Sequence, residues 1–168
     1  VSLAKELPND TAQVDFSISE LRGPSLHFEA VVTALNGKSK EAFYTEFFVL
    51  NNDLESILRN AGINLQNYSS IDSYAELWAR SRKNSFMFPG IQKQIRSVLL
   101  ELVEKGEGKR VRTDVDGAAK LLNFTEGSYF IIGTASLGKI GVTWSVPVAL
   151  NSGSNKISLT LANCSWSL

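Results

Sequence analysis

The residue types that most often carry catalysis are scarce in this sequence. It contains one histidine, His27, and one cysteine, Cys164. A zinc hydrolase needs two or three His or Cys ligands, so His27 alone cannot hold a catalytic zinc ion. A Ser-His-Asp system would have to use His27, yet no nucleophile-elbow motif lies near it. We therefore expect His27 to be an ordinary strand residue and Cys164 to be half-buried, without an internal disulfide partner.

Carboxylates suggest two other kinds of chemistry. The segment Asp114-x-Asp116-Gly117 is similar to the start of a calcium loop, but the twelfth position from Asp114 is Thr125 instead of a bidentate Glu. We expect a hairpin turn there, with positive φ at Gly117. Glu and Asp pairs that could cleave a glycosidic bond abound in residues 1–79, but no spacing singles one out. A carboxylate-based hydrolase is therefore a less favoured alternative, and we predict no catalytic residues, no metal and no cofactor.

Charge is unevenly placed along the chain, although the net charge is 0. Residues 1–79 contain 5 Lys or Arg against 11 Asp or Glu, a balance of −6, whereas residues 80–112 contain 9 against 3, a balance of +6. Residues 113–168 contain 3 of each kind. The simpler explanation is that these segments face each other or are solvated. The alternative is an anion-binding module using residues 80–112, with a surface made of Arg80, Arg82, Lys83, Lys93 and Arg96.

Aromatic and basic residues interleave between Trp78 and Phe88, an arrangement that could stack bases and contact phosphates. Trp78, however, lies on the apolar stripe of a predicted helix. The run Phe86-Met87-Phe88 is typical of a hydrophobic staple at the start of the next helix. We favour packing for these aromatic residues and expect no nucleic-acid partner.

Alternating apolar residues predict strands in the first fifty residues. Phe28, Ala30 and Val32 share one face of a strand over residues 26–35. The pair Asn36-Gly37 predicts a tight hairpin turn, with residues 41–50 as the return strand. Val14, Phe16 and Ile18 predict a further strand nearer the start of the chain.

Helical spacing replaces this alternation from Asn51 onward. A first helix over 54–61 would be capped by Asn52 and closed by Gly62, and a second, Ser73–Arg82, begins with a Ser73-x-x-Glu76 capping box. A third helix over 89–105 has Pro89 in its first turn. Its apolar stripe consists of Ile91, Ile95, Val98, Leu99, Leu102 and Val103. We expect this helical segment to pack against one sheet or its open edge, in a structural role.

Strand patterns return over residues 109–163, where short runs rich in Val, Ile and Leu are separated by Gly, Asn and Asp turns. Tyr129 and Trp144 should be core aromatic residues with a polar edge near the rim. At 168 residues the chain suits one domain, residues 1–168. The fold class expected is mainly β, an antiparallel Greek-key sandwich with strands within 1–50 and 109–163. A helical insertion of about three helices would occupy residues 51–106.

Two motifs resemble a known family. Thr113-Asp114-Val115-Asp116-Gly117 and the later Gly127-Ser128-Tyr129 are similar to the T-D-x-D/N-G turn and G-x-Y strand of transthyretin-like (prealbumin-like) sandwiches in carboxypeptidase regulatory-like domains. The helical insertion resembles a bacterial subset of that family. The resemblance covers about 100 of the 168 residues. Its motifs are turn and core motifs, which indicate the fold but say little about function.

The resemblance implies a non-catalytic extracytoplasmic module (periplasmic, cell-surface or secreted) for binding, adhesion or scaffolding. Related hydroxyisourate hydrolases use several His residues and a terminal Tyr-Arg-Gly-Ser, whereas this sequence reads Ser165-Trp166-Ser167-Leu168 at the same place and has no zinc-binding H-x-x-E motif. A protein or glycan partner is expected, with its identity and the oligomeric state left open. No membrane span is expected, because no run approaches the ~18–20 consecutive apolar residues that cross a bilayer.

Overall fold

The strand and helix patterns of the sequence appear in the expected order. The computed structural model describes residues 23–168, so the strand expected at Val14–Ile18 lies outside the described residues. The elements in order are β1 (Ser25–Thr33), β2 (Ser39–Glu41), β3 (Glu46–Leu50), α1 (Leu54–Asn60), η2 (Leu65–Asn67), α2 (Tyr74–Lys83), α3 (Ile91–Glu104), β4 (Gly108–Arg112), β5 (Ala118–Leu121), β6 (Gly127–Leu137), β7 (Ile140–Leu150), β8 (Ser154–Leu159), η3 (Leu161–Asn163) and β9 (Trp166–Ser167).

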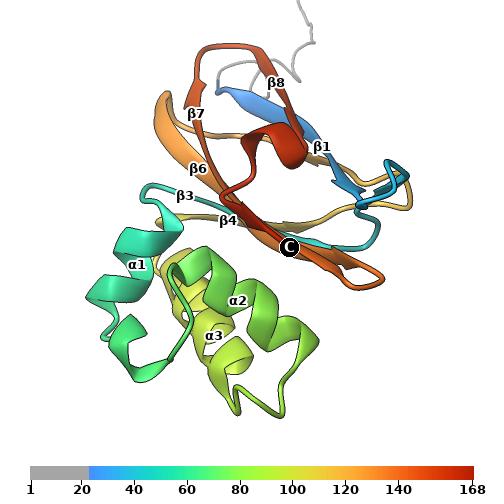
Figure 1. The fold of residues 1–168 in the computed structure, drawn as a ribbon. Coiled ribbons are helices and arrows are strands. Elements are labelled where there is room, and N and C mark those ends of the chain that lie inside the picture. Colours follow the sequence, from blue (N-terminus) through green and yellow to red (C-terminus); the bar gives the residue numbers. More distant parts are fainter. Residues whose placement is uncertain (1–22) are drawn as a thin grey trace, which may run out of the picture.

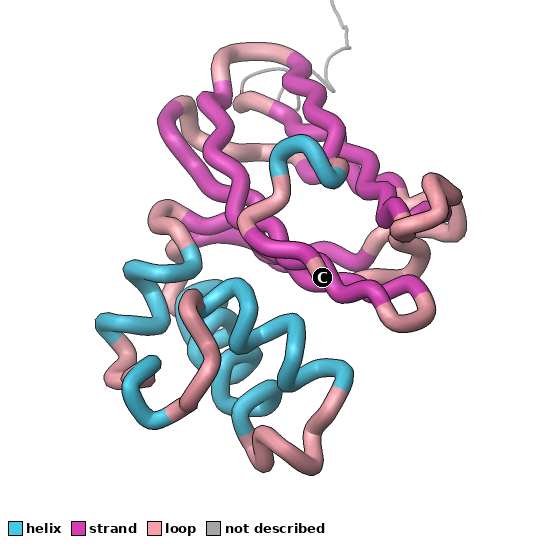
Figure 2. Tube along the Cα trace, viewed as in Figure 1, coloured by secondary structure: helices cyan, strands magenta, loops and turns pink. Residues whose placement is uncertain are grey.

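Two sheets and a helical layer are stacked on one another (Figure 1). One sheet has the order β2-β1-β5, with β8 also paired to β1, and the other has the order β4-β3-β6-β7-β9. The pairs are antiparallel except β1–β8, which runs parallel from Ser25 opposite Ser154. The three α-helices lie together on the outer face of the five-stranded sheet (Figure 2). The predicted β-sandwich with a helical insertion is confirmed, and the insertion covers a face of a sheet.

The five-stranded sheet is buried on both faces because its strands alternate between two cores. Phe47 and Val49 of β3 face the core between the sheets, where Phe47 contacts Phe28 and Trp144 at centroid distances of 5.1 and 5.8 Å. Phe48 and Leu50 face the helices. This two-sided burial explains the unbroken apolar run of β3.

The return strand expected over residues 41–50 is wrong as one continuous strand. The hairpin at Asn36-Gly37 forms, with φ of 85° at Gly37, but only Ser39–Glu41 pairs with β1. Tyr44 then adopts φ of 49°, and the chain crosses to the other sheet, where Glu46–Leu50 pairs with β4 and β6. The left-handed backbone conformation of Tyr44 redirects the chain. This conformation is uncommon for tyrosine, so the sequence did not predict the turn.

The capping residue of α1 differs from the expected one by one position, and α3 starts two residues later than expected. Asp53, and not Asn52, caps α1 by accepting a hydrogen bond from Ser56 N. Helix α3 begins at Ile91 after Gly90, so Pro89 lies before the cap and not in the first turn. Ser73 caps α2 as predicted.

The predicted hydrophobic staple is wrong for two of its three residues. Phe88 packs against Tyr68, with ring centroids 6.3 Å apart, but Phe86 and Met87 are exposed. The loop before α3 therefore turns two large apolar side chains toward solvent.

Several residue-level predictions are confirmed. Trp144 is fully buried, and its indole N–H reaches the carbonyl of Thr160. Cys164 is half-buried, and His27 is a residue of β1. The Asp114–Gly117 segment is a turn in which Asp114 Oδ1 accepts hydrogen bonds from two backbone N–H groups and Gly117 has φ of 76°. Within residues 23–168, no helix is both long and apolar enough to cross a bilayer.

Candidate binding site between helix α2 and the edge of the sheet

A pocket with a volume of about 590 Å³ opens between α2, the loops on either side of it and the β7–β9 end of the five-stranded sheet. Its charged and polar lining consists of Arg80, Lys83, Asn84, Ser69 and Ser70, and its apolar lining includes Trp166, Phe88, Met87 and Ile71. Among residues 23–168, no Asp or Glu lines it. The pocket therefore combines two cations, neutral polar groups and two aromatic rings.

Arg80 is held in place on two sides. Its Nε donates to Glu76 Oε2 over 2.7 Å, one helical turn earlier, and its guanidinium lies 5.2 Å from the centre of the Trp166 ring. The side chain remains 40% exposed. Its terminal nitrogens make no hydrogen bond to any of the described residues, so they remain available as donors.

Glu76 is the anion that anchors Arg80 from behind the pocket. Its side chain is only 8% exposed, and its other oxygen accepts a hydrogen bond from Asp72 N over 3.0 Å. Burial alone would raise the pKa of Glu76, but the bonds from Asp72 N and Arg80 outweigh it, and the pKa lies below its ordinary value. Glu76 is therefore ionised at neutral pH and keeps the guanidinium in position.

Trp166 reaches the pocket from β9, a strand the sequence did not reveal. Strand β9 pairs with β7 at Val142 and Thr143, and Ser165 N donates to the carbonyl of Thr143 over 2.8 Å. Thr143 also donates its hydroxyl to the carbonyl of Ala75 in α2 over 2.9 Å. One residue of β7 thus connects both walls of the pocket.

Lys83 lies one turn beyond Arg80 and joins the pocket to the β6–β7 hairpin. Its ammonium group donates to the carbonyl of Gly138, a neutral acceptor that leaves its charge uncompensated. Gly141 lies beneath its aliphatic stem, since a Cβ at Gly141 would stand 3.3 Å from Lys83 Cδ. The absence of a side chain at Gly141 leaves room for the lysine to lie across the sheet.

A second pocket, of about 580 Å³, lies on the other side of that hairpin. It is formed between the β1–β2 and β6–β7 hairpins and includes Lys38, Lys40, Lys139 and the exposed Leu35. In the part of the chain that the structure describes, no Asp or Glu lines this pocket either. Cationic residues therefore flank the β6–β7 hairpin on both sides.

The five candidate residues of the predicted anion-binding surface separate into three groups. Arg80 and Lys83 line the first pocket. Arg96 binds Glu46 with both its Nε and a terminal nitrogen, over 2.7 and 3.0 Å, and Arg110 binds the same carboxylate over 2.7 Å. Arg82 and Lys93 are exposed and do not line the pocket.

The carboxylates nearest to basic groups are poorly suited to proton transfer. Burial tends to raise the pKa of Glu46, but hydrogen bonds from Arg96 and Arg110 lower it below its ordinary value. The hydrogen bond to Glu46 in turn raises the pKa of Arg96. Glu46 and Glu76 therefore remain ionised and are engaged by arginines, whereas a general acid needs a raised pKa. Within the part of the chain that the structure describes, no three His, Cys, Asp or Glu side chains cluster as metal ligands would.

The sequence analysis did not predict several of the residues that line the two pockets. They are Trp166, Ser69 and Ser70 in the first pocket and Lys38, Lys40 and Lys139 in the second. One signal was available for α2, because Glu76, Arg80 and Lys83 follow one another at i, i+4 and i+7 and so share a face of the helix. Nothing in the sequence brings Trp166 to that face, since it is far along the chain and lies in a two-residue strand.

No protein-family model matches the sequence, and no curated protein matches it. Among solved structures, a candidate carbohydrate-binding protein from Pseudomonas aeruginosa is similar over 84% of this chain and 90% of its own, with 11% identity and a TM-score of 0.46. The full-length major pilin SpaD from Corynebacterium diphtheriae is similar over 88% of this chain and 33% of its own, with 17% identity and a TM-score of 0.33. The transthyretin-like resemblance stays a prediction, whereas the two-sheet sandwich with its three helices is established by the structure.

Proposed function

We propose that the chain is a non-catalytic binding module and that the pocket of Arg80 and Trp166 binds an acidic sugar residue of a glycan. The observation that carries this proposal is the placement of Arg80. Its guanidinium is fixed by Glu76 and Trp166, while its terminal N–H groups have no partner among the described residues. Such a preorganised guanidinium is suited to a carboxylate, which it can bind through two parallel hydrogen bonds.

The rest of the lining suits a sugar ring better than a bare anion. Trp166 and Phe88 offer apolar surface for the C–H face of a pyranose, and hydroxyls of Ser69 and Ser70 can exchange hydrogen bonds with ring hydroxyls. Asn84 accepts from Met87 N through Oδ1, which leaves its NH₂ group to donate. No Asp or Glu side chain of the described residues lines the pocket, which suits an acidic ligand.

Two other functions receive less support. A carboxylate-based hydrolase needs one protonated acid, but Glu76 and Glu46 are both ionised beside arginines. A broad anion-binding surface along residues 80–112 would need Arg96 and Arg110, which Glu46 already engages. The family resemblance supports an extracytoplasmic location, which is part of the present proposal.

Matched ligands and variants test this function. Binding of oligogalacturonate and of its methyl ester is measured by isothermal titration calorimetry and by tryptophan fluorescence. We expect the acid to bind and the ester to bind at least about tenfold more weakly, because the ester cannot accept the charge-assisted pair from Arg80. Arg80→Gln and Trp166→Ala should weaken binding of the acid by a similar factor. Arg59→Gln is the control, because Arg59 also pairs with a Glu one turn earlier but lies on α1, away from the pocket.

Equal binding of acid and ester, or equal losses for Arg80→Gln and Arg59→Gln, would overturn the proposal. Thermal unfolding of each variant shows whether a loss of binding reflects a loss of folded protein.

A further inference from the structure

Three turns lie in sequence around one margin of the molecule. The β1–β2 hairpin at residues 34–38 and the β6–β7 hairpin at residues 138–139 point to the right in Figure 1, and the α2–α3 loop at residues 84–90 lies at the lower end of the helical layer. The first two enclose the hairpin pocket, and Lys83, at the end of α2, is bonded to the carbonyl of Gly138 in the second. These contacts join the turns into one surface, which we call the loop-tip surface.

The most exposed large apolar side chains lie on this surface. Among residues 23–168, Phe86 is 91% exposed, Leu35 is 90% exposed and Met87 is 65% exposed, which exceeds every other large apolar side chain. Single exposed apolar residues are common on protein surfaces. Here Phe86 and Met87 lie on the α2–α3 loop and Leu35 lies on the β1–β2 hairpin, on either side of the β6–β7 hairpin. Several strongly exposed apolar residues on neighbouring loops are typical of an interaction surface.

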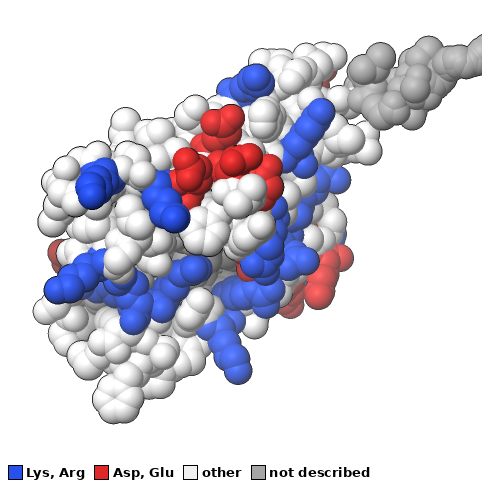
Figure 3. Space-filling view, turned by 90° about the vertical axis from the view of Figure 1, so that its right-hand side faces the viewer, with Lys and Arg blue, Asp and Glu red and all other residues white. Residues whose placement is uncertain are grey.

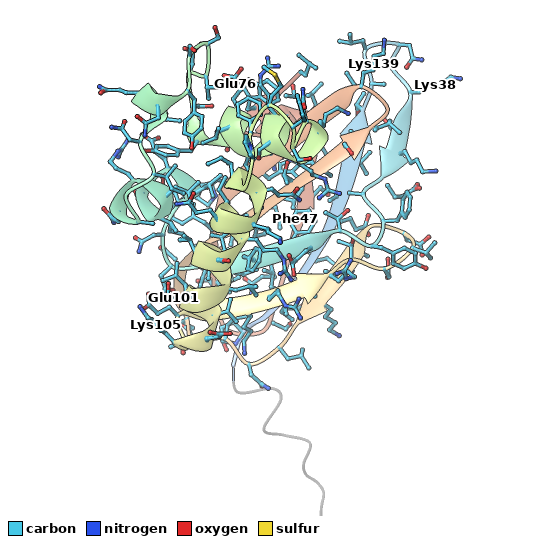
Figure 4. All side chains as sticks on the ribbon, turned by 90° about the horizontal axis from the view of Figure 1, so that it is seen from below. Lys38, Phe47, Glu76, Glu101, Lys105 and Lys139 are labelled. Atoms are coloured by element: carbon cyan, nitrogen blue, oxygen red, sulfur yellow. The ribbon has the colours of Figure 1, made fainter. Side chains whose placement is uncertain are left out.

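The same tips carry uncompensated positive charge. Lys38, Lys40 and Lys139 line the hairpin pocket, and none of them forms an ion pair with any of the described residues. Figure 4 shows Lys38 and Lys139 together at one corner of the molecule, with Glu101 and Lys105 at the opposite corner. Figure 3, which looks onto this side, shows Lys and Arg spread over the face, with a group of Asp and Glu beside them in its upper middle and more at one edge.

We propose that the loop-tip surface docks on a bilayer containing anionic phospholipid. Phe86 and Leu35 would enter the interfacial region, while Lys38, Lys40 and Lys139 contact lipid phosphates. Apolar residues bordered by lysines are suited to such an interface, since insertion and electrostatic attraction add together. A soluble polyanion would use the lysines but would gain nothing from fully exposed apolar tips. The combination of both features therefore favours a lipid surface.

Vesicle co-sedimentation tests the docking surface. The protein is mixed with vesicles of phosphatidylcholine alone and with vesicles of phosphatidylcholine and phosphatidylglycerol. We expect binding only to the anionic vesicles, and binding that weakens as salt is raised. The double variant Lys38→Glu/Lys139→Glu should lose on the order of tenfold or more of this binding. Lys105→Glu/Lys156→Glu is the matched control, because it changes charge equally on exposed residues outside the surface.

The apolar tips need a test of their own. Leu35→Ser/Phe86→Ser should reduce vesicle binding by on the order of tenfold, because two inserting side chains are lost. Leu122→Ser/Leu161→Ser, which alters two exposed apolar residues elsewhere, should have no effect. Neither tip residue lines the Arg80–Trp166 pocket, so oligogalacturonate binding should be unchanged in the tip variant.

Three results would overturn the proposal. The first is equal binding to neutral and anionic vesicles, and the second is wild-type vesicle binding by the tip variant. The third is tight heparin binding without binding to anionic vesicles, which would assign the lysines to a soluble polyanion. Loss of oligogalacturonate binding in Arg80→Gln with intact vesicle binding would separate this surface from the proposed glycan site.

Discussion

The indole Nε1 of Trp144 donates a hydrogen bond to the carbonyl oxygen of Thr160 over 2.9 Å. Trp144 lies at the centre of the core between the sheets, and Thr160 begins the η3 turn that leads the chain toward β9. The hydroxyl of Thr160 accepts from Ala162 N, so both ends of this contact are fixed. Together with the pairing of β9 to β7, this bond from a buried side chain fixes the segment that delivers Trp166 to the candidate pocket.

Replacing Trp144 by Ala should lower the free energy of unfolding by about 3–5 kcal/mol, because a fully buried indole is lost and a cavity remains. Trp144→Phe should cost less, about 1–3 kcal/mol, since it mainly leaves the Thr160 carbonyl without its donor. Urea denaturation measures both. A loss below about 1 kcal/mol for Trp144→Ala would contradict its place in the core.

Glu76 should make stability depend on pH in the acidic range. Its pKa is lowered from the ordinary value of 4.5, so the ionised form stabilises the fold above that pH, and the contribution is lost as pH falls through the folded-state pKa. At pH 7, Glu76→Gln should lower the free energy of unfolding by about 1–2 kcal/mol. The expected loss is small because solvent screens the charge of the partly exposed Arg80. The difference in the free energy of unfolding between Glu76→Gln and the wild type should decrease steadily below pH 4.5. A gap that stays constant down to strongly acidic pH would show that the charge of Glu76 is not the cause.

Two glycines of the five-stranded sheet should respond differently to an added methyl group. A Cβ at Gly133 would stand 2.3 Å from Phe47 Cδ1 in the core, so Gly133→Ala should destabilise the protein by about 1–3 kcal/mol. A Cβ at Gly141 would meet the flexible stem of Lys83 at 3.3 Å, which can move aside. Gly141→Ala should therefore keep near wild-type stability in thermal unfolding. Equal losses for the two variants would mean that the packing around Phe47 is not as tight as the structure indicates.

The carboxylate of Glu46 should couple two arginines that do not bond to each other. Arg96 binds both oxygens of the Glu46 carboxylate, and Arg110 binds Oε2, which it shares with Arg96. The two arginines are about half exposed, whereas Glu46 is largely buried. Each single Ala variant should cost about 0.5–1 kcal/mol, and the double variant should deviate from their sum by about 0.5 kcal/mol, because each arginine competes for the same charge. The deviation should shrink when both arginine changes are made in a Glu46→Gln background. Strict additivity in the wild-type background would argue that Glu46 binds only one of them in solution.

Local signals predicted most of the fold because they act over a few residues. Asn36-Gly37 forms its turn, Ser73 caps its helix, and Gly106 follows the end of α3, since each depends on backbone geometry close in sequence. Asn52 and Asp53 can both cap a helix, so sequence alone could not choose between neighbours. The crossing at Tyr44 was missed because both halves of residues 41–50 are strand-like, and only the other sheet decides where Phe47 pairs.

The candidate site was predicted only in part, for a related reason. Arg80 and Lys83 could be placed on one helical face, but their neighbours come from the ends of distant segments. Trp166 arrives through pairing of β9 with β7, and Lys139 through the β6–β7 hairpin. Long-range pairing of short strands leaves almost no periodic signal, so such a site becomes visible only when the sheets are assembled.

The helical insertion begins and ends at adjacent points of one sheet, which makes it removable. Leu50 at the end of β3 is paired with Gly108 at the start of β4, so an Asn-Gly turn could replace residues 51–107. We expect that shortened protein to aggregate, because removal of the helices uncovers Phe48, Leu50 and Ile132 on the face they now cover. Changing these three residues to Thr in the shortened protein should restore a soluble monomer, as judged by light scattering and circular dichroism. The matched control is the same triple change in the full chain, which should destabilise it, because the helical core would then face polar groups. A shortened protein that stays monomeric without the Thr changes would show that the helices are not needed as a cover, and their role would then lie in binding alone.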